Sequence, residues 1–320
     1  MSSSDTPAPT EGLTPSQLAS FARDGYLIIP SALPHSTVSS LLSEAHRLLS
    51  TLDLSTHPLT RFLTGGDTGD NHVGDAYFLS SGNKIHFFLE DDAFDPTTGQ
   101  LTKPPHRAVN KIGHYLHALS PPFASLLDPT KNDGMLARPA AVARSLGFQD
   151  PRVLQSMVIC KQPEIGGAVP PHQDSTFLYT DPPSAVGFWY ALEDATVENG
   201  CLSFLPGSHK WAGVERRLVR KGGEGEGTEM VGNEGSRFPK GMREEREERA
   251  EGEGEYVLGE VKAGSLVLIH GNLLHKSEQN LSSKGRIIYT FHVIEGAEGW
   301  EYDGRNWLQP PEEGFTKLYA

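Results

Sequence analysis

The part of the chain that follows Val153 consists of short apolar segments separated by turn residues, and this pattern constrains the fold more than any other feature. The segments are residues 153–159, 189–192, 201–205, 257–261, 265–269 and 286–294. Short strands at turn-marked intervals are typical of β-sandwiches and jelly rolls, the group of shapes that includes the cupins. The 34 glycines and 23 prolines suit many turns better than a helical bundle. The sequence therefore predicts a mainly β protein.

The first 150 residues carry the helices that we expect to flank this β structure. Thr14-Pro15-Ser16-Gln17 combines an N-cap, a proline in the first turn and a capping-box glutamine, and Gly25 ends the predicted helix. A strand is predicted over residues 26–29, an amphipathic helix from about Ser36, and a strand over residues 84–89. Residues 110–119 fit either a helix or an extended segment. Residues 121–149 are predicted to be helical and to support the sheet from outside.

Two segments are expected to lie outside the folded core. Residues 1–12 are polar and are predicted to be a disordered tail, which leaves residues 13–320 as a single domain. Within this domain, residues from about 220 to 255 form a low-complexity insert of Gly, Glu and Arg. The insert is too polar to bury a core of its own. We predict a solvated surface loop, with a lid over the substrate as the alternative.

Charge and cysteine content limit the partners and the compartment. A net charge of −13 argues against non-specific binding to nucleic acid or to an anionic membrane. Cys160 and Cys201 do not make a disulfide framework and are predicted to be small buried hydrophobes in a reducing compartment. The sequence shows no signal peptide, no apolar run of membrane-spanning length and no C-terminal peroxisomal signal. We therefore predict a cytoplasmic monomer or homodimer that acts on a small molecule.

The stretch Pro171-His172-Gln173-Asp174 is the first sign of chemistry. Among the 13 histidines, His172 is the only one with an acidic residue two positions later. If the stretch is a strand or its end, the side chains at positions i and i+2 point to the same face. Two histidines and one carboxylate on one face of an open site are the ligands of non-haem Fe(II) enzymes, which leave the other positions for a cosubstrate and O2. We therefore expect His172 and Asp174 to bind iron.

A third ligand is expected on a strand farther along the chain, and both His270 and His275 follow the predicted strand 265–269. His275 is favoured because Arg286 follows it and opens a strand. A lone guanidinium inside a barrel costs several kcal/mol unless an anion pairs with it. A guanidinium binds a carboxylate through two parallel hydrogen bonds. 2-Oxoglutarate supplies such a carboxylate at C5 while its other end chelates iron, and Ser277 is positioned in the sequence to donate to the same group.

The chain resembles the phytanoyl-CoA dioxygenase (PhyH) family of Fe(II)/2-oxoglutarate oxygenases over roughly residues 13–295, apart from the insert. The motifs that carry the resemblance are His172-Gln173-Asp174, residues 198–202, residues 205–209, and His275-Lys276-Ser277 with Asn280 and Arg286. Residues 157–163, 171–180 and 110–114 make it most similar to the branch called phytanoyl-CoA dioxygenase domain-containing proteins. The long insert and the missing peroxisomal signal separate it from the phytanoyl-CoA hydroxylase itself.

The resemblance implies a double-stranded β-helix and a set of site residues. His172, Asp174 and His275 would bind Fe(2+), and Arg286 and Ser277 would hold the distal carboxylate of 2-oxoglutarate. Lys111, Met157 and Trp189 would line the cosubstrate pocket. The implied reaction uses O2, with ascorbate as a possible stimulant, to hydroxylate or otherwise oxidise a C–H bond of a small organic or lipid-like substrate, with release of succinate and CO2.

Two other functions are compatible with the same pattern. One is a cupin-like metal hydrolase or isomerase that uses the same three ligands, although such an enzyme has no need of Arg286. The other is a non-catalytic double-stranded β-helix protein that binds 2-oxoglutarate or another ligand. The complete set of ligands argues against that loss of activity. The sequence leaves the identity of the substrate open.

Overall fold

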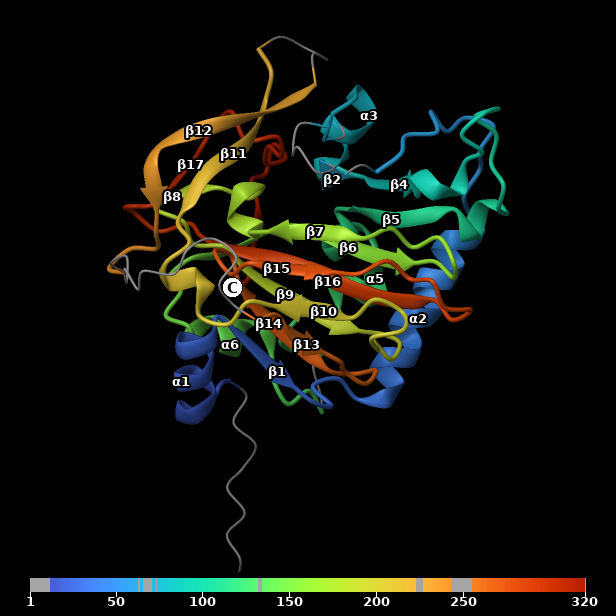
Figure 1. The fold of residues 1–320 in the computed structure, drawn as a ribbon. Helices are drawn as coiled ribbons and strands as arrows, with labels where there is room; N and C mark the ends of the chain where they lie inside the picture. Colours follow the sequence, from blue (N-terminus) through green and yellow to red (C-terminus); the bar gives the residue numbers. More distant parts are fainter. Residues whose placement is uncertain are drawn as a thin grey trace, which may run out of the picture.

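The computed structural model describes residues 12–62, 64–65, 71–72, 74–131, 134–222, 227–242 and 255–319. Two antiparallel sheets dominate this part of the chain (Figure 1). The strand order of the large sheet is β1 (Tyr26–Ile29), β14 (Leu266–His270), β9 (Val186–Ala191), β16 (Arg286–Glu295), β6 (Pro151–Lys161), β5 (Val109–His114) and β4 (Ile85–Leu89), and β18 (Thr316–Lys317) also pairs with β6.

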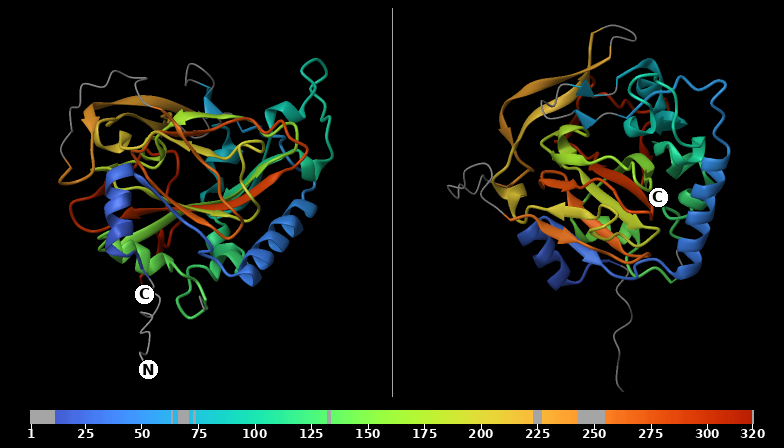
Figure 2. Two further views of the ribbon diagram at one scale, coloured as in Figure 1. Left: turned by 60° about the horizontal axis from the view of Figure 1, so that its bottom comes forward. Right: turned by 45° about the vertical axis from the view of Figure 1, so that its right-hand side comes forward.

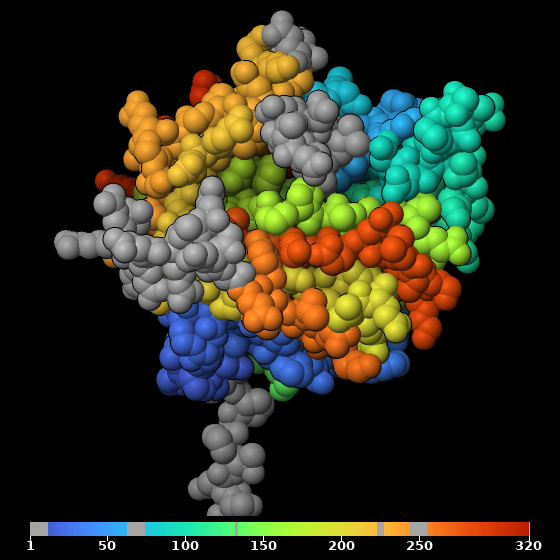
Figure 3. All heavy atoms as spheres, in the orientation of Figure 1, coloured from blue at the N-terminus to red at the C-terminus, as the bar shows by residue number. Residues whose placement is uncertain are grey.

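The small sheet carries the strands on which the predicted metal ligands lie. Its order is β13 (Val257–Gly259), β10 (Leu202–Phe204), β15 (His275–Ser277) and β7 (Val169–His172). In Figure 3 these strands form the central part of the visible face of the molecule. The two facing antiparallel sheets make a jelly roll of the cupin type, and the predicted mainly β fold is confirmed.

Alternation of side chains along the strands gives the large sheet two different faces. On β16, Tyr289 and Phe291 point away from the small sheet into one core cluster, whereas Ile288 belongs to the cluster between the sheets. On β9, Phe188 and Tyr190 face outward in the same way, and Trp189 faces inward. Because the period of a strand is two residues, Arg286 must share the inward face with Ile288. A charged residue at the start of an apolar strand thus enters the space between the sheets.

Helices cover the outer face of the large sheet and its edges. They are α1 (Pro15–Asp24), α2 (His35–Ser50), α3 (Ala76–Leu79), α4 (Leu116–Leu119), α5 (Pro121–Ala124) and α6 (Pro139–Ser145). The capping box of Thr14 and Gln17 is formed as predicted, and Gly25 ends α1 with a φ of 80°. Figure 2 shows α1 and α2 on opposite sides of the molecule. The apolar face of α2 belongs to the same core cluster as Tyr289 and Phe291.

Three segments differ from the expectations or complete them. Residues 110–119, left open by the sequence, contain both most of β5 and the short helix α4. The predicted helical character of residues 121–149 is correct only for α5 and α6, because turns fill the described positions between them. Two further pairs are β8 (Thr180–Asp181) with β17 (Glu301–Tyr302) and β2 (Thr64–Gly65) with β3 (Asn71–His72).

We predict a surface loop for the whole insert, and this prediction is wrong for part of it. Strands β11 (Val214–Arg220) and β12 (Thr228–Arg237) pair as an antiparallel ribbon, so about ten residues of the low-complexity segment form a strand. Backbone hydrogen bonds between the two strands stabilise the ribbon, although the segment has few apolar residues to bury. Residues 243–254 of the insert and residues 1–11 of the predicted tail lie outside the described residues. Among the described helices, none is both long and apolar enough to cross a bilayer.

Candidate functional site

A cavity of about 480 Å³ lies between the two sheets and contains every site residue that the sequence predicted. Its lining includes His172, Asp174, His275, Lys111, Met157, Trp189, Ser277 and Arg286. The register of the two central strands arranges the inward residues in rows, which pair Arg286 with Lys161, Ile288 with Ile159, Thr290 with Met157, and His292 with Gln155. A charged row therefore lies at one end of this wall, and a neutral polar row lies at the other.

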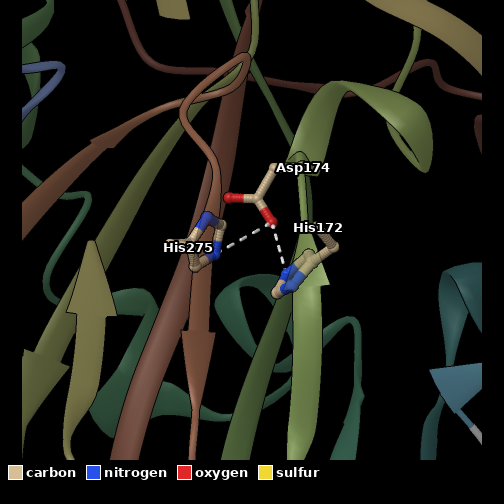
Figure 4. A group of neighbouring side chains, drawn as sticks. All are labelled: His172, Asp174 and His275. Atoms are coloured by element: carbon tan, nitrogen blue, oxygen red, sulfur yellow. Dashed lines mark ion pairs between the residues drawn. The ribbon is translucent and has the colours of Figure 1, made fainter. Parts of the chain in front are cut away.

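His172, Asp174 and His275 come together although about a hundred residues separate the last from the first (Figure 4). His172 ends β7 and His275 begins β15, and the two residues are direct partners in the small sheet. Asp174 begins the short 3₁₀ turn that follows β7. The ligand atoms of the three side chains all lie within 4.8 Å of one another. Atoms in this arrangement can hold one metal ion.

Distances and hydrogen bonds suit a divalent metal. The Nε2 atoms of His172 and His275 lie 3.6 Å and 3.8 Å from Asp174 Oδ1. Neighbouring ligands of a metal bound at about 2.1 Å lie about 3 Å apart, so a small contraction would bring all three side chains to one ion. Each imidazole donates its Nδ1–H to a backbone carbonyl two residues earlier, that of Pro170 or Leu273, at 3.0 Å. This fixes the tautomer and leaves both Nε2 lone pairs for the ion.

The electrostatics of the site keep its ligands in the states that metal binding needs. Burial raises the pKa of Asp174, but His292, His275 and His172 lower it more, so the pKa lies well below its usual range. Burial and the neighbouring His172 lower the pKa of His275 to about 4. At neutral pH the site therefore holds one carboxylate and a neutral His275, which is the charge state of a 2-His-1-carboxylate ligand set.

Arg286 lies at the charged end and is 3% exposed. One guanidinium nitrogen donates to the carbonyl of Gly200 at 2.8 Å, and the guanidinium carbon is 5.4 Å from the centre of the Trp189 ring. The buried Nε atom has no hydrogen-bond partner among the described residues. Burial lowers the pKa of Arg286 to about 10, and the groups that oppose this shift are the Cys201 and Cys160 thiols. A buried cation with a free donor fits an anionic ligand.

The backbone conformation at position 200 requires glycine. Its φ is 79°, a region that side chains with a Cβ rarely adopt, and a Cβ would lie 2.5 Å from the carbonyl oxygen of Glu278. Only glycine therefore brings this carbonyl to Arg286 without moving the chain.

Two lysines add to the positive charge of the cavity: Lys161 lies in the row of Arg286, and Lys111 lies one row farther along the wall. Lys111 Nζ lies 3.1 Å from the centre of the Phe62 ring and 3.8 Å from Met157 Sδ. Burial lowers its pKa to about 7, and Glu90 opposes that shift. Lys161 donates to the backbone carbonyls of Gly167 and Glu278, and burial together with Arg286 lowers its pKa to about 7. Arg286 and Lys161 make the charged end a site for an anion, and Lys111 extends the positive charge toward Met157 and Phe62.

The depressed pKa of Lys111 gives a stability prediction. Lys111→Met should raise the melting temperature of the metal-free protein, because burial disfavours the ammonium. The cost is greatest below the folded-state pKa of about 7 and fades as pH rises toward the ordinary value of 10.5. We expect a gain of several degrees at pH 6, at roughly 2–4 °C per kcal/mol, and a smaller one at pH 9. Calorimetry at both pH values measures the difference.

The exposed Lys284 provides the matched control, and Lys284→Met should leave the melting temperature nearly unchanged at both pH values. A gain for Lys111→Met that is equal at the two pH values, or larger at pH 9, would contradict the proposed origin of the effect.

Three other histidines, His270, His117 and His114, have different environments. His270, the alternative third ligand, packs against His209 with 4.8 Å between ring centres and lies outside the group of ligands. His117 forms a hydrogen bond with Ser156 on the outer face of the large sheet. His114 lines the cavity. Cys160 and Cys201 are both buried and free, as predicted.

Sequence reasoning missed His292 and Gln155, which complete the neutral end of the cavity. His292 Nε2 lies 3.3 Å from Asp174 Oδ2, so this ring supports the carboxylate of the ligand set. The period of two that places Ile288 and Thr290 beside Arg286 also includes position 292. The same rule connects Gln155 to Met157. The period of two therefore predicts that each side chain faces inward, but it does not predict that the two residues are neighbours.

The comparisons with known proteins identify the family. The sequence profile of the family described as phytanoyl-CoA dioxygenase (PhyH) matches residues 21–288. A phytanoyl-CoA dioxygenase domain-containing protein 1 of Bos taurus is 44% identical over 312 residues, which cover 96% of this chain and 99% of that protein. A phytanoyl-CoA dioxygenase of Arabidopsis thaliana is 40% identical over 302 residues, with 94% and 95% covered.

Solved structures agree on the fold. The epimerase SnoN, crystallised with Fe3+, alpha ketoglutarate and nogalamycin RO, superposes with a TM-score of 0.57 at 18% identity over 94% of this chain and 91% of that chain. EctD from S. alaskensis, crystallised with 2-oxoglutarate and 5-hydroxyectoine, gives a TM-score of 0.54 at 21% identity, with 91% and 78% covered. Since the sequence profile and the relatives span nearly the whole chain, this protein is a member of the phytanoyl-CoA dioxygenase family.

Proposed function

We propose that this protein is an Fe(II)- and 2-oxoglutarate-dependent dioxygenase that oxidises a C–H bond of a small organic or lipid-like molecule and releases succinate and CO2. One observation carries the proposal. His172, Asp174 and His275 converge at the wall of a cavity whose other end holds the buried guanidinium of Arg286. A redox metal and a dicarboxylate cosubstrate account for both features at once.

Each protein group has a defined part in this proposal. His172, Asp174 and His275 would hold the metal. Bound iron, with 2-oxoglutarate and O2, supplies the oxidising chemistry. Arg286 and Ser277 bind the distal carboxylate of the cosubstrate, and the wall around them excludes water, so the guanidinium acts at low dielectric.

Lys111, Met157 and Trp189 are proposed to line the cosubstrate. Met157 and Trp189 both flank Thr290 in the register of the large sheet, so the two side chains form adjacent parts of the wall. Lys111 adds a cation near the sulfur of Met157. No side chain has to act as a general base, because the protein's task is to orient the reactants and to keep the site dry.

Solved structures that share the fold support the cofactors. SnoN was crystallised with Fe3+ and alpha ketoglutarate, and EctD with 2-oxoglutarate and, in another crystal, with Fe. The two free cysteines support a reducing compartment, so we propose a cytoplasmic enzyme that acts on a small molecule as a monomer or homodimer. A hydrolase or isomerase with the same ligands gives no reason for the buried Arg286.

Uncoupled turnover tests the proposal. Metal-free protein is supplied with Fe(II), ascorbate and 2-oxoglutarate labelled at C1, and released CO2 and succinate are measured without a substrate. We expect slow formation of both products with Fe(II) and none with Zn(II). Binding of 2-oxoglutarate without turnover, even with candidate substrates, would favour the non-catalytic alternative. If 2-oxoglutarate does not bind in the presence of Fe(II), the proposed function is wrong.

A further inference from the structure

The neutral end of the cavity contains polar atoms that the metal site does not use. His292 and Gln155 are partners in the register of β16 and β6, and each is 6% exposed. His292 Nδ1 and Gln155 Oε1 are buried and have no hydrogen-bond partner among the described residues. Both residues line the cavity. Buried polar groups are nearly always paired in folded proteins, so two adjacent unpaired groups indicate a missing partner.

The hydrogen bonds of His292 define what that partner has to offer. Its Nε2 lies 3.3 Å from Asp174 Oδ2, and a carboxylate oxygen accepts rather than donates. In the neutral imidazole the Nε2 atom therefore carries the proton, and Nδ1 presents a lone pair. Gln155, the partner of His292 in the strand register, contributes a buried carbonyl oxygen. Two neighbouring acceptors require a donor, which an O–H or N–H group of a ligand supplies.

The remaining walls of this end are apolar and aromatic. Phe78 and Trp307 stack with 4.3 Å between ring centres, and Phe177 lies 6.1 Å from the ring of His172. Leu178 and Leu218 add aliphatic surface. Arg286 and Lys161 form a row at the other end, six residues along β16 from His292, which is roughly 20 Å for an extended strand. Lys111 lies between the two ends, with its Nζ 3.8 Å from Met157 Sδ and 3.1 Å from the centre of the Phe62 ring.

Size limits the ligand further. A cavity of about 480 Å³ is at the small end of the roughly 300–1,000 Å³ range of small-molecule sites, and the cosubstrate takes part of it. The part of the cavity that the cosubstrate leaves free therefore suits a small molecule.

We propose that His292 and Gln155 form the recognition site for the substrate, which is a small uncharged molecule with an apolar, ring-containing body and one O–H or N–H donor. That this molecule is the substrate rests on the proposed function, but the existence of the binding site does not. His292 would then act as a positioning residue for Asp174 and as a specificity residue for the substrate. A carboxylate at this end would face the two acceptors and would satisfy neither of them.

The test compares three probes that share one ring system. 2-Naphthol has a donor, 2-methoxynaphthalene has none, and 2-naphthoate is charged. Their dissociation constants are measured by ligand-observed NMR on the full-length, metal-free protein, with and without 2-oxoglutarate. We expect 2-naphthol to bind at least about tenfold more tightly than the methyl ether, because the ether leaves the acceptors unpaired. 2-Oxoglutarate should displace 2-naphthoate from the charged end and should leave 2-naphthol bound.

Variants assign the effect to the two residues. Gln155→Leu and His292→Phe should each reduce the preference for 2-naphthol over its ether several-fold, while binding of the ether persists and shows that the pocket is intact. Gln100→Leu, at an exposed position, is the matched control and should keep the wild-type preference. Failure of 2-naphthol to bind, displacement of it by 2-oxoglutarate, or an unchanged preference in both variants would overturn the inference. Because the assay needs neither iron nor turnover, its failure is distinct from failure of the decarboxylation test.

Discussion

Asp174→Ala is expected to abolish the formation of succinate. Asp174 is the only anionic ligand of the three, and its low pKa keeps it charged across the physiological range. Loss of residues that merely support metal ligands costs about 10–100-fold in metal affinity, so loss of this ligand should cost at least about 100-fold. Metal content by mass spectrometry and succinate by NMR should fall together.

The histidines provide the internal controls for this experiment. His172→Ala and His275→Ala should match Asp174→Ala in metal content and turnover. His270→Asn should retain both, because its side chain can still accept the hydrogen bond that His270 Nδ1 accepts from the Asn272 amide. Normal turnover in Asp174→Ala, or loss of metal in His270→Asn equal to that in His275→Ala, would defeat the assignment of the ligands.

Arg286→Ala should raise the concentration of 2-oxoglutarate that half-saturates the enzyme. Removing one partner of a buried, hydrogen-bonded charge pair costs roughly 2–5 kcal/mol, which corresponds to about 30-fold to several-thousand-fold in affinity. Among the described residues, the guanidinium contacts Gly200 and Trp189 and none of the metal ligands, so iron should still bind. Initial rates of decarboxylation against 2-oxoglutarate concentration, together with metal content, measure the two effects separately.

Two arginine variants sharpen that result. Arg286→Lys keeps the charge but loses the forked pair of donors, so its requirement for 2-oxoglutarate should lie between those of the wild type and Arg286→Ala. Arg107→Ala changes an exposed arginine and should leave the requirement unchanged. If Arg286→Ala has the wild-type requirement, the proposed binding of the distal carboxylate is incorrect.

Local patterns predicted most of the fold because the rules behind them are local. The capping box at Thr14, the end of α1 at Gly25 and the apolar segments from Val153 onward all became the expected elements. The insert was harder, because β12 forms by hydrogen bonding to β11 and not by burying apolar residues. The composition of a segment predicts whether its side chains are buried, but it does not predict which strand it pairs with.

The candidate site was predictable for a different reason. His172 and Asp174 are two residues apart, so a short-range rule places them together, and Arg286 stands out as a charge at the start of an apolar strand. His275 could be chosen over His270 only through its spacing to Arg286. His292 and Gln155 lie on strands that pair across more than a hundred residues. Their juxtaposition depends on the register of the sheet, which the sequence alone did not supply.

The crowding of Lys161 and Arg286 at one end of the cavity has a consequence for the life of the protein in the cell. Arg286 lowers the pKa of Lys161, so the two cations repel each other when the cavity is empty. A bound dianion relieves that repulsion, and any ligand that binds only the native state stabilises it by mass action, by about 2.7 kcal/mol at 100 times its dissociation constant. On the proposed function, the resistance of this chain to proteolysis would rise and fall with the supply of 2-oxoglutarate, so its abundance would follow central carbon metabolism even when its substrate is scarce.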